Sequence, residues 1–135
     1  MSAPTPELEF LFTMTADVGM KGMVKDGPNG TRVIVSAESG TVVGPVINGT
    51  LSGPGGDWVV MNADGSMKLD VRVLIKTDDG DIYMTYHGFG DKDGIRTAPR
   101  FETGIASLAW LNSSICVAVG KQIEGGVEYN VFRVL

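Results

Sequence analysis

Apolar and polar residues alternate with a period of two along much of this chain. The segment 67–76, MKLDVRVLIK, alternates strictly, and the segment 8–15, LEFLFTMT, has the same pattern. A period of two places alternate side chains on opposite faces of an extended strand, which is typical of a β-strand with one buried face. The apolar face of the first segment consists of Met67, Leu69, Val71, Val73 and Ile75.

Short apolar segments rich in β-branched residues continue this pattern to the end of the chain. We expect further strands in 32–40, 40–49, 57–62, 81–88, 106–112, 114–121 and 128–135. Asp-Gly pairs at 64–65 and 79–80 separate some of these segments, and Asp-Gly is a strong signal for a β-hairpin. No segment has a helical period longer than two turns. The polar segment 96–104, RTAPRFETG, offers Arg96, Arg100 and Glu102 as candidate polar anchors and Phe101 as an apolar one. The alternative is a loop held by its own ion pairs.

The predicted fold is therefore all-β, a single compact antiparallel β-barrel of about eight to ten strands. Closure into a barrel hides the edges that so many apolar strands would otherwise expose. The length of 135 residues corresponds to one domain, residues 1–135, in which residues 1–6 are expected to form a flexible N-terminus.

The charged residues bear on the kind of partner. The net charge is −5, and the 11 lysines and arginines form no cluster, so we expect no nucleic acid partner. No apolar segment is long enough for a membrane helix, and no secretory signal is visible, so no membrane partner and a cytoplasmic location are expected. With one histidine and one cysteine, a metal site built from several such residues is excluded within one chain. We expect no metal and no cofactor, although a carboxylate site from Asp57, Asp70 and Glu102 remains an alternative.

The segment 44–58, GPVINGTLSGPGGDW, combines glycine and proline with an acid and a tryptophan. Glycine allows positive φ angles and close approach of the backbone. One interpretation is a loop at the mouth of a pocket, with Asp57 and Trp58 entering the next strand beside it. The alternative is a corner of the barrel with Trp58 packed in the core. The segment lacks the Gly-Lys-Ser/Thr of a phosphate-binding loop.

Asp70 and Arg72 lie two residues apart in a strand, so both project from the same face. If that face lines a cavity, Asp70 is a candidate general acid or base and Arg72 a stabiliser of developing negative charge. If the face is external, the two residues belong to a solvated stripe with Lys68 and Lys76. The functional hypothesis requires the inward orientation. Tyr86 lies on the opposite strand face from Tyr83 and His87, and it is a candidate proton donor.

Several motifs in a fixed order, GGDW, LDVR, KTDDG, RTAPRFETG, AWLN and VAVG, together resemble the bacterial and fungal domain-of-unknown-function family 3237, also called uncharacterised protein family 0311. The resemblance covers about residues 6–135 and implies a compact, self-associating β-barrel. It also places Asn48, Asp57, Trp58, Asp70, Arg72, Phe101, Glu102, Trp110 and Asn112 in a recurrent pattern. Family members often have a longer, partly helical excursion before RTAPRFETG, whereas only HGFGDKDGI stands here.

Together these patterns predict a small-molecule-binding barrel, and an enzyme would be a cofactor-independent isomerase, cyclase or lyase that uses acid–base chemistry on a small organic ligand. The catalytic candidates are Asp70, Arg72 and Tyr86. The candidates for substrate binding are Asn48, Asp57, Trp58, Phe101, Glu102, Trp110 and Asn112. The alternatives are a non-catalytic carrier or sensor and an interaction module in a homodimer or higher homo-oligomer.

Overall fold

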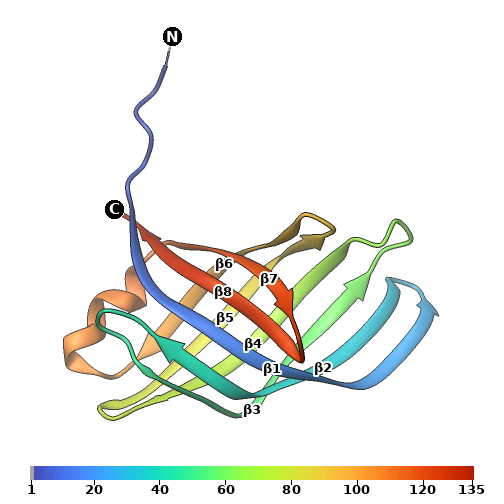
Figure 1. The fold of residues 1–135 in the computed structure, drawn as a ribbon, viewed down its shortest axis with the longest axis horizontal. Helices are drawn as coiled ribbons and strands as arrows, with labels where there is room; N and C mark the ends of the chain where they lie inside the picture. The colour runs from blue at the N-terminus through green and yellow to red at the C-terminus, as the bar shows by residue number, and fades with distance from the viewer. Residues whose placement is uncertain (1) are drawn as a thin grey trace.

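Eight antiparallel strands close into a barrel in the computed structural model, which describes residues 2–135 (Figure 1). The elements are β1 Leu8–Gly27, β2 Gly30–Val43, β3 Gly49–Met61, β4 Met67–Thr77, β5 Gly80–Asp91, β6 Gly94–Thr103, a 3₁₀ helix η1 Ala106–Ser113, β7 Cys116–Ile123 and β8 Gly126–Val134. Each strand pairs with the next, and β8 pairs with β1 to close the ring. The predicted all-β barrel is confirmed.

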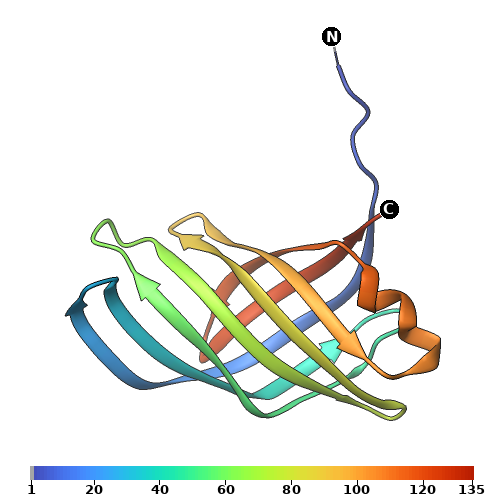
Figure 2. The same cartoon turned by 180° about the vertical axis from the view of Figure 1, so that it is seen from behind.

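The two ends of the barrel differ. The hairpin turns that join β1 to β2, β3 to β4, β5 to β6 and β7 to β8 lie toward one end, and η1 lies at the opposite end near the C-terminus (Figures 1 and 2). We call the first the open end and the second the closed end. Since β1 and β2 are the longest strands, their hairpin projects beyond the rest of the barrel at the open end.

Large side chains fill the closed end. Phe12 and Phe101 pack edge to face with their ring centroids 5.9 Å apart, a favoured aromatic geometry. The buried residues around them include Ile47, Ile75, Ile82, Met84, Leu108 and Leu111. The last two come from η1, which therefore closes this end of the barrel.

The segment 106–112 is a 3₁₀ helix, so its prediction as a strand was wrong. Its buried residues, Leu108 and Leu111, are three positions apart. That spacing places them on one side of a helix with three residues per turn, whereas it places them on opposite faces of a strand.

The segment 96–104 lies almost entirely in β6, so its interpretation as a loop was wrong. Thr97, Pro99 and Phe101 point inward, and Ala98 and Arg100 between them point outward. The β6–β7 pairs end at Thr97, so the missing N–H of Pro99 interrupts no pairing with β7. The segments 32–40 and 40–49 also differ from the prediction, because residues up to Val43 form one continuous strand, β2.

Residues 2–7 contain no regular secondary structure. Met1, part of the N-terminal segment that was expected to be flexible, lies outside the described residues. Within residues 2–135, no helix has the length and apolar composition required to cross a membrane.

Candidate functional site

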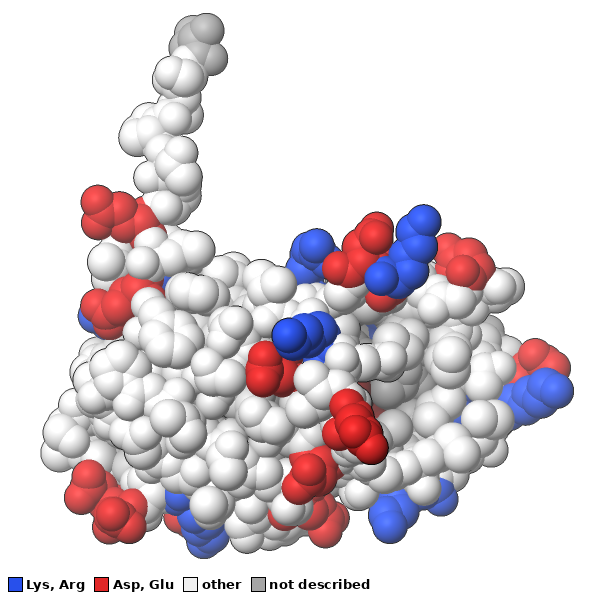
Figure 3. Space-filling model, in the orientation of Figure 1, with Lys and Arg blue, Asp and Glu red and all other residues white. Residues whose placement is uncertain are grey.

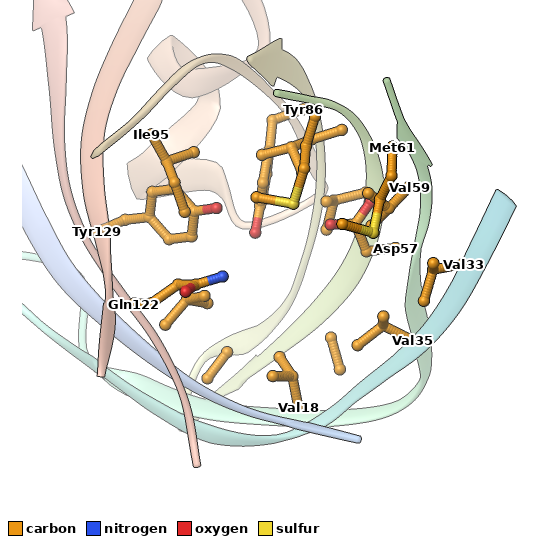
Figure 4. Close-up of a pocket in the computed structure, with 16 residues that line it drawn as sticks. Val18, Val33, Val35, Asp57, Val59, Met61, Tyr86, Ile95, Gln122 and Tyr129 are labelled. Atoms are coloured by element: carbon orange, nitrogen blue, oxygen red, sulfur yellow. The ribbon is translucent and has the colours of Figure 1, made fainter. Parts of the chain in front are cut away.

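A cavity of about 140 Å³ lies inside the barrel, in the half nearer the open end (Figure 4). Most of its wall is aliphatic. It is lined by Ala16, Val18, Val33, Val35, Ala37, Asp57, Val59, Met61, Met67, Leu69, Val71, Tyr86, Ile95, Gln122, Val127 and Tyr129. Asp57, Tyr86, Gln122 and Tyr129 carry the polar groups of this wall.

The cavity exists because inward-facing residues at this end are small. Ala16 of β1 and Ala37 of β2 occupy inward positions, whereas the closed end has phenylalanine, isoleucine and leucine. Met61, Met67, Ile95 and Gln122 also line a wider hollow of about 840 Å³ at the hairpin turns. We call this second hollow the vestibule. The cavity therefore opens through the vestibule, where the space-filling surface is hollowed (Figure 3).

Asp57 is the only acidic residue in the cavity wall. Alternation along β3 directs Asp57, Val59 and Met61 inward and Trp58 outward. The backbone N–H of Asp70 donates a hydrogen bond of 3.0 Å to Oδ1 of Asp57. Burial and, to a smaller extent, the nearby charge of Asp70 raise the pKa of Asp57 from 3.8 to about 6, against the opposing effect of this hydrogen bond. Its carboxyl group therefore exchanges a proton near neutral pH.

Two tyrosines lie beside this carboxyl group. Tyr86 of β5 and Tyr129 of β8 are only 4% and 3% exposed, and their ring centroids are 5.2 Å apart. Burial raises the pKa of Tyr86 far above its usual value and that of Tyr129 to about 12, so both hydroxyls are protonated at neutral pH. The Asp57 charge raises both values as well. Figure 4 shows the two hydroxyls and the Asp57 carboxyl group directed toward the same space.

This arrangement combines one exchangeable carboxyl group with two neutral hydroxyl donors inside an aliphatic wall. A carboxyl group with a pKa near 6 can act as acid or as base at neutral pH. Neutral tyrosines can donate hydrogen bonds to a ligand oxygen and stabilise negative charge on it.

Asp70 and Arg72 do not face the cavity, so the orientation that the functional hypothesis required was wrong. The inward residues of β4 are Leu69, Val71 and Val73, and the residues between them project outward. The Asp70 carboxylate lies 3.2 Å from Nε2 of His87, with the two side chains 37% and 77% exposed. The Arg72 guanidinium lies 5.6 Å from the ring centroid of Trp58 on the outer surface. Strict alternation correctly predicted which residues of β4 share a face. It did not determine which of the two faces lies inside the barrel.

We expect the Asp70–His87 pair to contribute little to stability. Exposed ion pairs contribute about 0–1 kcal/mol, because water screens them and two side chains lose freedom. Asp70→Asn should therefore change the free energy of unfolding by less than about 1 kcal/mol, measured by urea denaturation at pH 6. A loss well above this range would show that the carboxylate of Asp70 supports the fold or the Asp57 site.

The structure brings only two of the sequence-predicted site residues, Asp57 and Tyr86, to the cavity. Phe101 belongs to the closed-end core. Trp110 of η1 stacks against Arg133, whose Cζ atom lies 4.3 Å from the centroid of the Trp110 ring. Trp58 lies on the outer surface, so it belongs neither to the core nor to the cavity wall.

The two predicted asparagines stabilise turns. Asn48 accepts a hydrogen bond from the backbone N–H of Gly44 and donates one to its carbonyl, at 3.1 and 3.0 Å. Asn112 holds the backbone of Thr103 in the same way, at 2.8 and 3.0 Å. Glu102 is exposed on β6 and, with Phe101 and Asn112, lines a separate hollow of about 210 Å³. None of these residues faces the cavity.

Sequence reasoning missed Tyr129, Gln122 and the small residues of the wall. Alternation in the segment 126–134 places Tyr129 and Val131 on one face, which was a usable signal for an inward tyrosine. The pairing of β8 with β7 and β1, which brings Tyr129 to Tyr86 across the barrel interior, was not visible in the sequence.

Metal ligands do not converge in the described part of the chain. Within residues 2–135, no group of three histidine, cysteine, aspartate or glutamate side chains is placed to hold a metal ion. Asp70 and Glu102 point outward while Asp57 points inward, so the alternative carboxylate site from these three residues is not formed. The free cysteine, Cys116, is buried, and burial raises its pKa to about 11.

Comparison with known proteins gives relatives that span nearly the whole chain. A UPF0311 protein of Rhodopseudomonas palustris strain TIE-1 is 27% identical, and the match covers 98% of this chain and 99% of the relative. The crystal structure of a conserved protein of unknown function from Rhodopseudomonas palustris has 28% identity and a TM-score of 0.90, covering 98% of this chain and all of the other. A protein from Acinetobacter baumannii described as β-barrel-like has a TM-score of 0.86 at 25% identity, covering 99% of each chain.

A fungal relative has a named activity. The hydroalkoxylation enzyme phnH of Penicillium herquei is 30% identical over 115 residues, which cover 83% of this chain and 73% of the relative. The family described as "Protein of unknown function (DUF3237)" matches residues 6–93 and 89–134. Taken with the closed eight-stranded barrel, these matches show that the chain belongs to the DUF3237 family.

Proposed function

We propose that this protein binds a small, mostly apolar organic molecule in its barrel cavity and catalyses a proton transfer on it, with Asp57 as the general acid and base. The observation that carries the proposal is the carboxyl group of Asp57, which has a pKa of about 6 inside an otherwise aliphatic cavity with two tyrosine hydroxyls. Placing a carboxyl group among apolar atoms destabilises the fold unless it is partnered, so its presence favours a functional role.

The cavity favours a small-molecule site over an interaction module. An interaction module needs no interior space, whereas this barrel keeps its open half hollow. Ligand pockets have mainly apolar walls with a few polar groups that fix orientation, which describes this cavity. Asp57, Tyr86, Gln122 and Tyr129 supply those polar groups.

Hydroalkoxylation, the activity named for the fungal relative, supports an addition of O–H across a carbon–carbon double bond. In such a reaction on an enone, protonated Asp57 donates a proton to the α-carbon while the ligand's hydroxyl oxygen bonds to the β-carbon. The hydroxyl proton then passes to the Asp57 carboxylate. The product is an isomer of the substrate and Asp57 returns to its starting form, so no oxidant, reductant or cofactor is required. Tyr86 and Tyr129 would stabilise charge on the carbonyl oxygen by hydrogen bonding.

A single-ring enone tests this proposal. We expect the protein to accelerate the cyclisation of 1-(2-hydroxyphenyl)but-2-en-1-one to 2-methylchroman-4-one and to give a non-racemic product, because the cavity presents one face of the carbon–carbon double bond to the hydroxyl oxygen. Acid–base assistance of this kind contributes about 10²–10⁴-fold in rate. Chiral chromatography measures the rate and the enantiomeric excess together.

The matched control uses two aspartates on adjacent strands. Asp57→Asn should return the reaction to its background rate and to a racemic product, whereas Asp70→Asn, which alters an outward carboxylate, should leave both unchanged. Binding of the enone without acceleration would replace the catalytic proposal by that of a carrier. The absence of binding, measured by isothermal titration calorimetry, would overturn the small-molecule site.

A further inference from the structure

Four of the six methionines within residues 2–135 lie at the open end of the barrel. Met61 of β3 and Met67, the first residue of β4, line both the cavity and the vestibule. Met20 and Met23 lie in the projecting half of β1 and are 65% and 51% exposed. Such exposure is unusual for methionine, which is commonly buried in protein cores.

Strand register shows which face of the β1–β2 hairpin carries Met20 and Met23. Met20 pairs directly with Val35 of β2, and Met23 pairs with Val33. Directly opposed residues in an antiparallel pair project from the same face. Val33 and Val35 line the cavity, so Met20 and Met23 lie beside this part of the cavity wall, on the same face of the hairpin.

Val18, Val33 and Val35 form the side of the cavity contributed by β1 and β2 (Figure 4). The two exposed methionines extend this aliphatic wall across the hairpin, from β2 onto β1. The vestibule differs from this face, since the turns that line it present Asp64, Asp91 and Asp93 with Lys92 and Lys121. The β1–β2 hairpin thus offers a mainly apolar surface beside the cavity, whereas the turns offer a mainly charged one.

The volume of the cavity limits what can lie wholly inside it. An apolar cavity of about 150 Å³ in another protein holds one benzene molecule, and the cavity here has a volume of about 140 Å³. A single aromatic ring therefore fills it, and any further part of a ligand must leave through the mouth.

We propose that the ligand consists of one hydroxyl-bearing ring, held in the cavity, and a flexible apolar extension that lies along Met20 and Met23. This inference rests on the proposed small-molecule site and names the class of molecule that it takes. Methionine suits such a surface, because its unbranched side chain adapts to different apolar shapes. Met61 and Met67 contact the junction between the ring and the extension.

The test compares two ligands. Phenol is the hydroxyl-bearing ring alone, and 4-hexylphenol is the same ring with an apolar extension. Binding is followed by NMR on protein labelled with ¹³C in the methionine methyl groups. Both ligands should shift the signals of Met61 and Met67. Only 4-hexylphenol should also shift those of Met20 and Met23. The signals of Met14 and Met84, which are buried outside the cavity wall, serve as internal controls.

Matched variants on the same hairpin measure the contribution of the methionine face. The double variant Met20→Gln/Met23→Gln should weaken binding of 4-hexylphenol about tenfold and change the Kd of phenol by less than about twofold. Val24→Gln is the control, because Val24 is a similarly exposed apolar residue that pairs with Arg32 and so lies on the other face. It should leave both affinities unchanged.

Each contrary outcome separates this inference from the proposed function. If phenol shifts Met61 and Met67 while the hexyl chain leaves Met20 and Met23 unaffected, the extension is wrong and the small-molecule site stands. If phenol and 4-hexylphenol both fail to shift any cavity signal, the site itself is overturned. If the Met20 and Met23 signals move with protein concentration instead of ligand, the face belongs to an interface with a second copy and the inference fails.

Discussion

Replacing Asp57 by Asn is expected to stabilise the folded protein by about 2–3 kcal/mol at pH 7.5 and to remove its acid–base chemistry. Burial raises the pKa of Asp57 from 3.8 to about 6, so its ionised form is less stable in the folded barrel than in the unfolded chain. One pKa unit corresponds to about 1.4 kcal/mol, which gives about 3 kcal/mol as the upper limit for this shift. The side-chain oxygen of Asn can still accept the hydrogen bond from the Asp70 N–H.

The sign follows from proton binding. Between pH values of about 4 and 6, the folded state holds the Asp57 proton while the unfolded chain has lost it. Folding stability therefore falls as the pH rises through this window, and the loss is complete above the folded pKa. Asn carries no such penalty. The gain from Asp57→Asn should be about 1 kcal/mol at pH 4.5 and about 2–3 kcal/mol at pH 7.5.

Urea denaturation at both pH values measures the effect, with Asp70→Asn as the outward-facing control. The control should show a much smaller gain between pH 4.5 and 7.5 relative to the wild type, because the charge of Asp70 contributes less than burial to the raised pKa of Asp57. A variant Asp57→Asn that is less stable than the wild type at pH 7.5 would contradict the raised pKa. A variant that is more stable yet retains full turnover of the enone would contradict the catalytic assignment.

Gly120→Ala is expected to destabilise the barrel by about 1–3 kcal/mol and to displace the Tyr129 ring. A Cβ atom at Gly120 of β7 would lie 2.4 Å from Cδ1 and 2.5 Å from Cε1 of Tyr129. These distances are far inside van der Waals contact, so the ring or the strand must move. Overpacking of this kind in a well-packed interior costs about 1–3 kcal/mol. Gly120 thus gives Tyr129 the space that directs its hydroxyl toward Tyr86.

A double-mutant cycle separates this contact from a general effect of the substitution. In a Tyr129→Ala background the ring is absent, so Gly120→Ala should cost less than about 1 kcal/mol. Gly104→Ala is the control, because a Cβ there meets no atom within 4 Å. Thermal and urea unfolding measure the free energies. Equal costs of Gly120→Ala in both backgrounds would show that the ring does not limit this position.

The effect on ligand binding distinguishes positioning from stability. If Gly120 positions Tyr129, Gly120→Ala should weaken phenol binding under conditions where the variant is fully folded. A variant that binds phenol as tightly as the wild type would show that the Tyr129 hydroxyl is not needed in its observed place.

Two sequence patterns predicted most of the architecture. Alternation in segments such as 67–76 predicted strands, and Asp-Gly pairs predicted the hairpin turns, because both are local properties of neighbouring residues. The same local reasoning failed at 106–112, where apolar residues three apart form η1. It also failed at Pro99, whose acceptability in β6 depends on where the β7 partner ends.

The sequence by itself determined that Asp57, Tyr86 and Tyr129 each occupy a strand and which neighbours share their faces, since the period of an extended chain is fixed by backbone geometry. Only the tertiary structure decided that these faces point inward while those of Asp70 and Arg72 point outward. The physical reason is that inside and outside are defined by the burial of all eight strands together. Small residues on β1 and β2 leave a cavity only because closure of the ring places them opposite those polar groups.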